Sequence, residues 1–315
     1  MNKVLRYSLR LILVLFVLVN MITAFHAYKF THFYDASEVQ VKRREDKSSL
    51  EITKEILFGI NAIKRRVTPV ADSSLQTVYF TTKDEIKIEA WHLQPPVATK
   101  GTVIMFHGHG GTKSSIIHEA QAFNKMGYNT LLVDFRAHGN SGGNTCTIGY
   151  NETEEVKLAY DYIKQKGENN IILWGISMGA ATIIKAMNDY PLQPAKIIAE
   201  MPFGSIEEAA AGRIKLMGLP AQPLATLITF WGGAEHGFWA FNMKPAEFAK
   251  KINRPVLLQW GRHDPRVTEK ETYDIFNNLP GPKTLAVYEQ SGHESLYKRE
   301  NTKWLNEVQN FLSHQ

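Results

Sequence analysis

The stretch Ile171–Tyr190 reads IILWGISMGAATIIKAMNDY, and its pattern decides the fold. An apolar run of strand length, Ile171–Trp174, leads into G-I-S-M-G at residues 175–179, and a segment rich in small residues follows. A strand, a tight turn and a helix in this order place a serine on a sharply folded backbone, where close neighbours demand glycine. The pattern therefore predicts that Ser177 is a nucleophile at the carboxyl end of a strand.

Strand and helix patterns alternate on both sides of this stretch. An alternation with short connections is typical of a mostly parallel sheet with helices on both faces. We therefore predict an α/β fold with an eight-stranded sheet. Its strands are expected at Thr77–Thr81, Ile86–Leu93, Thr102–Phe106, Thr130–Asp134, Ile171–Trp174, Lys196–Glu200, Val256–Trp260 and Thr284–Tyr288, and its helices at Ser114–Met126, Glu152–Lys166, Met178–Tyr190, Thr268–Asn278 and Lys298–Leu312.

One segment, Gly204–Lys251, is longer than a single crossover helix requires. It is rich in large apolar residues and carries several glycines and prolines, which favours an insertion of short helices that covers the site as a lid. These apolar residues either line a pocket or pack on the body of the protein. We expect three parts of the chain: an N-terminal segment at 1–30, a linker with an amphipathic helix at 31–75, and a catalytic domain at 76–315 with the lid at about 204–251.

A serine hydroxyl becomes nucleophilic when a histidine takes its proton and an acid orients that histidine. After a strand–serine–helix turn the expected chain order is serine, acid, histidine. Asp264 lies in G-R-H-D-P-R-V just after the strand Val256–Trp260, and His293 lies in S-G-H-E-S just after Thr284–Tyr288. Catalytic groups of open α/β sheets gather at the carboxyl ends of the strands. We therefore predict the triad Ser177, Asp264 and His293.

The tetrahedral intermediate of this chemistry needs backbone N–H donors around its oxyanion. The expected donors are Met178, which follows the serine, and a residue of the loop H-G-H-G-G at 107–111. We choose His109 for this second donor, with Gly110 as the alternative. A metal held by His107 and His109 is disfavoured because no third ligand is evident.

Three other residues compete for these roles. His263 is adjacent to Asp264 and therefore poorly placed to bridge the acid and the serine. Asp134 also follows a strand, but we interpret it as an ion-pair partner of Arg136 that fixes the loop D-F-R-A-H-G-N-S-G-G. His236 falls in the lid and is interpreted as a solvated or lid residue.

The N-terminus begins with Lys3, Arg6 and Arg10, which precede an apolar run from about Leu9 to Ala27. This length is close to the roughly 20 residues that span a membrane. We favour an uncleaved anchor with the catalytic domain outside the cytoplasm, because positive residues stay on the cytoplasmic side. A cleaved signal peptide with a secreted product is the alternative.

A second apolar pattern, with isoleucines at 52, 56, 60 and 63, predicts an amphipathic helix over Leu50–Ile63. This helix either lies on an anionic membrane surface or packs on the body. Residues 1–66 carry 12 Lys and Arg against 6 Asp and Glu, and the remainder carries 24 against 25. The catalytic region is therefore near neutral, which argues against nucleic acid as a partner. The single cysteine, Cys146, excludes an intrachain disulfide.

The motifs quoted above resemble the α/β-hydrolase superfamily over about residues 76–313. Within it, the chain is similar to the BEM46-like and serine-aminopeptidase-like hydrolases, which have a membrane-spanning N-terminus and a simple His-Gly oxyanion loop. The resemblance implies the same triad, with no cofactor and no metal. His109 interrupts the H-G-G-G pattern of hormone-sensitive-lipase-like esterases, and Ser177 stands where haloalkane dehalogenases have aspartate. The superfamily supports many chemistries on one fold, so the substrate is not implied.

Four functions fit to different degrees. Hydrolysis of a carboxylic ester or thioester with an apolar acyl group uses the whole triad and the apolar lid. An aminopeptidase or amidase uses the same triad and needs acids for a substrate ammonium, for which Glu200, Glu207, Glu208 and Glu235 are candidates. Acyl transfer to an alcohol needs the same groups in a site that excludes water. A non-catalytic, membrane-tethered module predicts a broken triad, and the oligomeric state is left open.

Overall fold

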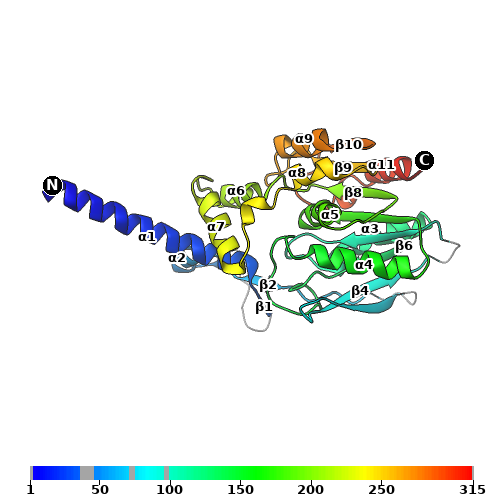
Figure 1. The fold of residues 1–315 in the computed structure, drawn as a ribbon, viewed down its shortest axis with the longest axis horizontal. Coiled ribbons are helices and arrows are strands. Elements are labelled where there is room, and N and C mark those ends of the chain that lie inside the picture. Colours follow the sequence, from blue (N-terminus) through cyan, green and yellow to red (C-terminus); the bar gives the residue numbers. More distant parts are fainter. Residues whose placement is uncertain (1–2, 36–45, 71–74, 96–98, 314–315) are drawn as a thin grey trace.

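The main body of the protein is built on one eight-stranded sheet (Figure 1). A computed structural model describes residues 3–35, 46–70, 75–95 and 99–313. Across the sheet the strands follow the order β10-β9-β8-β7-β5-β6-β4-β3. Their bounds are β3 Gln76–Thr81, β4 Lys87–Leu93, β5 Thr102–Phe106, β6 Asn129–Val133, β7 Ile171–Ile176, β8 Lys196–Glu200, β9 Val256–Gly261 and β10 Lys283–Tyr288.

The directions of the strands confirm the predicted α/β class. β4 is antiparallel to both β3 and β6, and the other neighbouring pairs are parallel. Every residue of β5 is buried, as expected for a central strand covered on both faces. The edge strand β3 instead alternates, with Tyr79 exposed and Phe80 buried. Each strand begins and ends within two residues of its predicted bounds.

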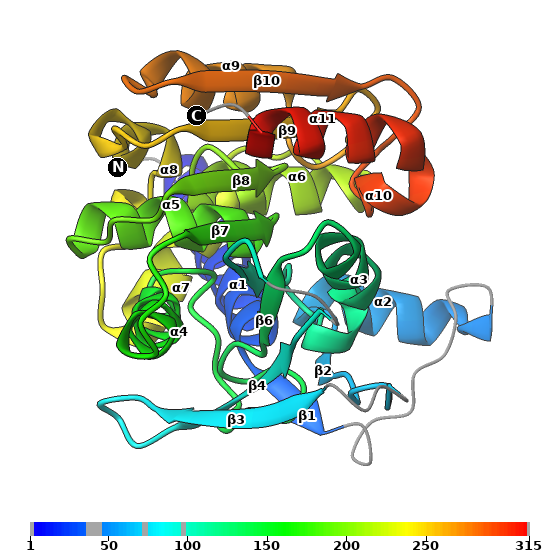
Figure 2. The ribbon, with the colours of Figure 1, turned by 90° about the vertical axis from the view of Figure 1, so that its right-hand side faces the viewer.

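Helices cover both faces of the sheet (Figure 2). On one face α4, α5, α8 and α9 contact one another in succession, and on the other α3 and α11 meet through the rings of Phe123 and Trp304. The predicted helix at 114–126 begins as a 3-10 turn, and the one at 298–312 is divided at Glu300. The bounds are 3-10 turn Lys113–Ile116, α3 Ile117–Lys125, α4 Thr153–Gln165, α5 Met178–Asp189, α8 Pro245–Phe248, α9 Glu269–Asn278, α10 Leu296–Arg299 and α11 Asn301–Ser313.

The N-terminal arm begins with α1, Lys3–Thr31, which projects from the body (Figure 1). It is long and apolar enough to cross a membrane. After it, β1 Phe33–Asp35 pairs in parallel with β2 Ala62–Lys64. Residues 36–45 of the predicted linker lie outside the described residues.

The amphipathic helix is shorter than predicted. α2 covers Ser49–Phe58, where Ser48 and Glu51 form a reciprocal N-terminal cap, and it ends at Gly59, whose φ is 78°. Residues 60 and 63 are therefore not helical, and the prediction of a helix to Ile63 is wrong at this end. No residue of α2 is buried, and the helix packs against α1, with the rings of Phe25 and Phe58 in edge contact. The helix thus packs on the N-terminal arm.

The predicted lid consists of short helices: α6 Ile206–Leu216, α7 Leu224–His236, the 3-10 turns Ala240–Asn242 and Ala249–Lys251, and α8. α7 packs along α1, where Trp231 Nε1 donates a hydrogen bond to Asn20 Oδ1 at 3.1 Å. Ala27 of α1 is buried and faces Gly232 of α7. The lid therefore joins the N-terminal arm to the catalytic body.

Candidate active site

Ser177 lies on the turn between β7 and α5, with φ 54° and ψ −117°. A positive φ is unusual for a residue other than glycine, so the turn must be held by its surroundings. The flanking glycines explain how. A Cβ at Gly179 would lie 2.2 Å from the carbonyl oxygen of Phe106, and one at Gly175 would lie 2.6 Å from the backbone carbon of Gly179. Larger residues at these two positions would push α5 away from β5 and β7, and Ser177 would lose its position.

His293 and Asp264 follow β10 and β9, which are parallel neighbours, so their loops meet beside Ser177. His293 Nε2 lies 2.9 Å from Ser177 Oγ, and Asp264 Oδ2 accepts a hydrogen bond of 2.7 Å from His293 Nδ1. The other carboxylate oxygen of Asp264 accepts the backbone N–H groups of Arg266 and Val267 at 2.8 and 2.9 Å. The side chain of Asp264 is fully buried. The three residues predicted as a triad are thus brought together in the order that proton transfer requires.

The loop after β5 lies directly against the serine, since a Cβ at Gly108 would be 3.3 Å from Ser177 Cβ. The backbone N–H of Gly110 donates to His138 Nε2 at 3.0 Å, and that of Gly111 donates to the carbonyl of Gly108. Gly110, the alternative oxyanion donor, is therefore already engaged. In the described part of the chain no acceptor is found for the N–H groups of His109 and Met178.

Two buried histidines, His107 and His138, shape this loop. His107 Nδ1 donates to the carbonyl of Gly108 at 2.8 Å, and its Nε2 accepts from the N–H of Phe135. His138 Nδ1 donates to the carbonyl of Arg136, and its Nε2 accepts the N–H of Gly110. Burial lowers the pKa of His107 to about 4 and that of His138 to about 3. Both rings are therefore neutral near pH 7 and act as fixed hydrogen-bond partners of the loop.

His109 is held from an unexpected direction. Its Nε2 donates to the carbonyl oxygen of Phe30, in the last turn of α1, at 3.0 Å, and the two rings are 4.7 Å apart. Burial, together with the charges of Arg213 and Arg266, holds the pKa of His109 well below its usual value. Because this ring nitrogen and both ring nitrogens of His107 have other partners, the two histidines do not form a metal site. Groups of three possible ligands are likewise absent from the described residues.

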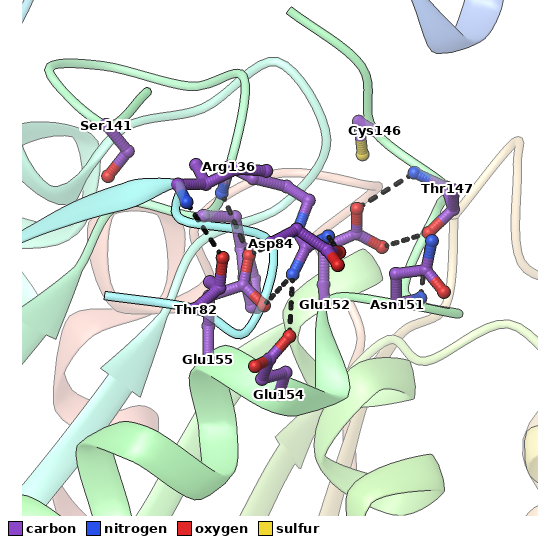
Figure 3. Close-up of polar contacts among 12 residues, drawn as sticks. Thr82, Asp84, Arg136, Ser141, Cys146, Thr147, Asn151, Glu152, Glu154 and Glu155 are labelled. Atoms are coloured by element: carbon purple, nitrogen blue, oxygen red, sulfur yellow. Dashed lines mark hydrogen bonds and ion pairs between the residues drawn. The ribbon is translucent and has the colours of Figure 1, made fainter. Parts of the chain in front are cut away.

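The interpretation of Asp134 and Arg136 as an ion pair is wrong. The carboxylate of Asp134 instead accepts hydrogen bonds from the backbone N–H and from the ammonium group of Lys113, and both side chains are fully buried. Arg136 points the other way, toward α4, and donates to Glu155 at 2.7 Å and to Glu154 at 3.3 Å (Figure 3). The two charges are near in sequence, but the loop turns between them and each finds a partner on a different element.

His263, His236 and Cys146, all among the described residues, form no hydrogen bond with Ser177. His263 is exposed. His236 is half-buried at the end of α7, where its ring stacks on that of His32 with centroids 5.4 Å apart. Cys146 is buried, with its sulfur 3.6 Å from that of Met178. Burial and the charge of Glu152 raise the pKa of this thiol, which keeps it protonated.

A cavity of about 420 Å³ opens over Ser177. Four parts of the chain contribute to its wall: the catalytic loops, α6 of the lid, α2, and the end of α1. The lining residues are Phe30, Lys47, Ile52, Glu55, Ile56, Ile60, His109, Ile148, Ser177, Met178, Phe203, Ala209, Arg213, Leu216, Met217, Arg266, Val267 and His293. Most of the wall is apolar, which suits an acyl chain.

The sequence did not reveal all of these contributors. The large apolar residues of the lid were expected either to line a pocket or to pack on the body. Met217 lines the cavity, whereas Trp231 faces α1 and Trp239 is exposed. Phe30 and Arg213 were missed because nothing in their spacing relates them to Ser177. Gly212, at which α6 approaches the segment after Asp264, is a local signal of close packing that could have pointed to Arg213.

The chain is similar to several known proteins. The family of serine aminopeptidases (S33) matches residues 97–233. The quorum-quenching protein AidA of Acinetobacter baumannii is 31% identical, over 65% of this chain and 72% of its own length. The lysophosphatidylserine lipase ABHD12 of Xenopus tropicalis is 23% identical, over 67% of this chain and 59% of its own length. The structure of a Pyrococcus furiosus esterase superposes with a TM-score of 0.65 at 23% identity, covering 79% of this chain and 96% of the esterase.

The chain therefore belongs to the α/β-hydrolase family and is a hydrolase of the esterase and lipase type. Because the solved esterase is only 23% identical to this chain, its likeness supports the fold alone.

Proposed function

We propose that the protein is a serine esterase or thioesterase that acts on apolar acyl groups through Ser177, His293 and Asp264. The observation that carries this proposal is the continuous hydrogen-bonded chain from Ser177 Oγ through the ring of His293 to Asp264 Oδ2, at 2.9 and 2.7 Å. A serine on a positive-φ turn, hydrogen-bonded to a histidine that an acid orients, is activated for nucleophilic attack on an acyl carbon.

The reaction follows from the positions of these groups. Ser177 Oγ attacks the acyl carbon while His293 Nε2 takes the hydroxyl proton, and Asp264 keeps the other ring nitrogen protonated toward itself. The N–H groups of His109 and Met178 stabilise the oxyanion. Collapse breaks the bond to the leaving alkoxide or thiolate, which receives the proton from His293. Water then adds to the acyl-enzyme with His293 again as base, and this releases the acid.

Amide hydrolysis with an amino-terminal substrate has less support. The acids considered for a substrate ammonium do not line the cavity over Ser177. Glu200 is buried between Trp174 and Trp304, and Glu207 and Glu208 contact residues of the lid. Lys47 and Glu55 pair with each other, so among the described residues the unpaired charges of the cavity are those of Arg213 and Arg266. Both are positive and would repel a substrate ammonium group.

The test of the proposal is Ser177→Ala in the full chain, assayed on p-nitrophenyl esters, acyl thioesters and aminoacyl anilides. We expect turnover of the esters or thioesters to fall by at least about 10³-fold, as when a catalytic serine is removed elsewhere. Cys146→Ala is the matched control, because it removes the single thiol of the chain and leaves Ser177, His293 and Asp264 in place, and we expect it to keep its activity. Equal turnover by Ser177→Ala and the parent protein would overturn the proposal.

We further propose that α1 is a retained membrane anchor with the catalytic body outside the cytoplasm. Support comes from its contacts: Thr23 and Ala27 are buried against the body, and Asn20 accepts the bond from Trp231. Mapping the N-terminal peptide of the membrane-bound protein tests retention, and accessibility of the body to added protease in intact cells tests the side. A mature chain that begins after Ala27, or a body protected from protease, would contradict these two proposals respectively.

A further inference from the structure

We propose that Arg213 and Arg266 form a subsite for an anionic group, a carboxylate or a phosphate, carried by the ester that reaches Ser177. The inference rests on the proposed function and specifies its substrate class. Four ionisable residues besides His293 and His109 line the cavity: Lys47, Glu55, Arg213 and Arg266. Lys47 and Glu55 neutralise each other at 2.6 Å.

The two arginines have no such partner. Within the described residues, neither guanidinium forms a hydrogen bond or an ion pair, and Arg213 instead lies over the ring of Phe30, 4.4 Å from its centroid. A guanidinium presents five N–H donors in a planar fork that matches carboxylate and phosphate oxygens. The pair therefore leaves a set of unused donors facing an otherwise apolar cavity.

Both arginines line the same cavity as Ser177 and His293. The backbone N–H of Arg266 donates to Asp264 Oδ1 at 2.8 Å, which ties its segment to the proposed catalytic acid. A Cβ at Gly212 would lie 2.4 Å from the carbonyl oxygen of Arg266, so α6 rests directly on this segment and brings Arg213 beside it. Both charges also contribute to lowering the pKa of His109, the expected oxyanion donor. The subsite is thus adjacent to the place where the ester carbonyl would lie.

Two neighbouring guanidinium groups without an anionic partner are electrostatically unfavourable. Burial and the neighbouring charge of Arg266 lower the pKa of Arg213 to about 10. Two like charges beside each other in a partly buried cavity repel, and an anion bound between them would relieve this and use the free donors. The remaining wall is apolar, with Ile52, Ile56 and Met217 among its residues. The matching substrate is an amphiphilic ester with an apolar chain and an anionic group near the scissile bond.

The anion can belong to the leaving alcohol or to the acyl group, and matched substrate pairs distinguish the two. One pair is 1-oleoylglycerol 3-phosphate and 1-oleoylglycerol. The other is the monomethyl ester of octanedioic acid and methyl octanoate. For one of the pairs we expect kcat/KM of the full chain to favour the charged member by at least about tenfold, and Arg213→Gln and Arg266→Gln each to lower that ratio about tenfold, since charge-assisted hydrogen bonds are lost.

The matched control is Lys215→Gln, which removes one exposed positive charge from the same helix, two residues from Arg213, and keeps the ratio of the parent protein. Arg266 is exposed, so its substitution remains informative even where Arg213→Gln impairs folding. A ratio near one in the parent protein for both pairs overturns the subsite. So does an equal loss on charged and neutral substrates in both arginine variants, because that indicates a structural role.

A binding measurement separates this inference from the proposed function. Full-chain Ser177→Ala in non-ionic detergent is titrated with decyl phosphate and with 1-decanol in a calorimeter. We expect decyl phosphate to bind at least about tenfold more tightly, and the added Arg266→Gln substitution to remove the difference. Selective binding without ester turnover in the parent protein would refute the esterase and keep the subsite. Ester turnover without selectivity, in binding or in kcat/KM, would keep the esterase and refute the subsite.

Discussion

The two halves of α1 share one helix but differ in their surroundings. In the outer half, Lys3–Leu18, every residue is exposed. In the inner half, Val19–Thr31, residues Thr23, Ala27 and Thr31 are buried at four-residue spacing, and Phe30 contacts the oxyanion loop. Exposed apolar residues over such a length need a solvent other than water, whereas the buried stripe needs a protein surface. Under the proposed function, the outer half is the part of α1 that lies in the membrane, and the inner half forms part of the active site.

The largest expected effect lies in the catalytic body and is independent of the arm. Asp264→Asn leaves the shape of the relay but disturbs the protonation of His293, and we expect kcat to fall by roughly 10³–10⁴-fold. The fall should be the same with and without residues 1–18, measured on a water-soluble ester. A loss that depends on the outer half would show that the two halves are not separable in function.

The next effect compares the halves directly. A chain without residues 1–18 should keep ester turnover within about threefold but no longer sediment with phospholipid vesicles. A chain without residues 1–31 also loses the acceptor of His109 Nε2, and we expect kcat/KM to fall at least about tenfold, since a displaced oxyanion donor costs more than that. Circular dichroism shows whether the second chain still folds. Full activity of a folded chain lacking residues 1–31 would contradict a role of the inner half in the site.

A smaller effect is expected from a larger side chain among the buried residues of the inner half, Thr23, Ala27 and Thr31. Ala27→Phe places a large ring between α1 and Gly232, and overpacking of this kind costs about 1–3 kcal/mol. Thermal unfolding of the detergent-solubilised chain should show a lower Tm. Val14→Phe, at an exposed position of the outer half, is the matched control and should leave the Tm unchanged. Equal shifts would mean that the inner half is not docked.

The last effect is the smallest over a single pH unit, and it concerns the body alone. Glu200 is buried, and its Oε1 accepts hydrogen bonds from Trp174 and Trp304. Burial raises the pKa of Glu200 to about 8, above the 4.5 of an unfolded glutamate. The folded protein therefore holds a proton that the unfolded chain releases, and stability should fall as pH rises from about 5 to 8, with a slope of at most about 1.4 kcal/mol per pH unit.

Glu200→Gln keeps a neutral oxygen acceptor for both indoles and should remove this slope, as measured by urea unfolding at several pH values. The change should be identical in chains with and without the outer half. An unchanged slope would mean that Glu200 is already ionised in the folded protein.

The sequence was informative wherever a residue's position followed from its own strand. Ser177, Asp264 and His293 each lie after a strand of a parallel sheet, so their meeting at one edge could be predicted before the lid or the arm was known. The end of α2 was predicted wrongly, because the isoleucine spacing at 60 and 63 was weighed above Gly59, which is a common C-terminal signal of a helix.

The remainder depended on packing between distant segments. Phe30 reaches His109 because α1 lies along α7, and Arg213 faces Arg266 because Gly212 lets α6 come close. The contact of Phe30 leaves no pattern along the chain, and that of Arg213 leaves only the neighbouring glycine at position 212. Lys113 and Asp134 are likewise paired by the fold, although Arg136 is the nearer charge in sequence.

Labelling of the full chain with a fluorophosphonate probe, followed by peptide mapping in a mass spectrometer, tests the reactive serine most directly. We expect one modified site, Ser177, and loss of the label in His293→Ala, because the hydroxyl then lacks its base. A label on another serine, or an active esterase in which Ser177 remains unmodified, would contradict it.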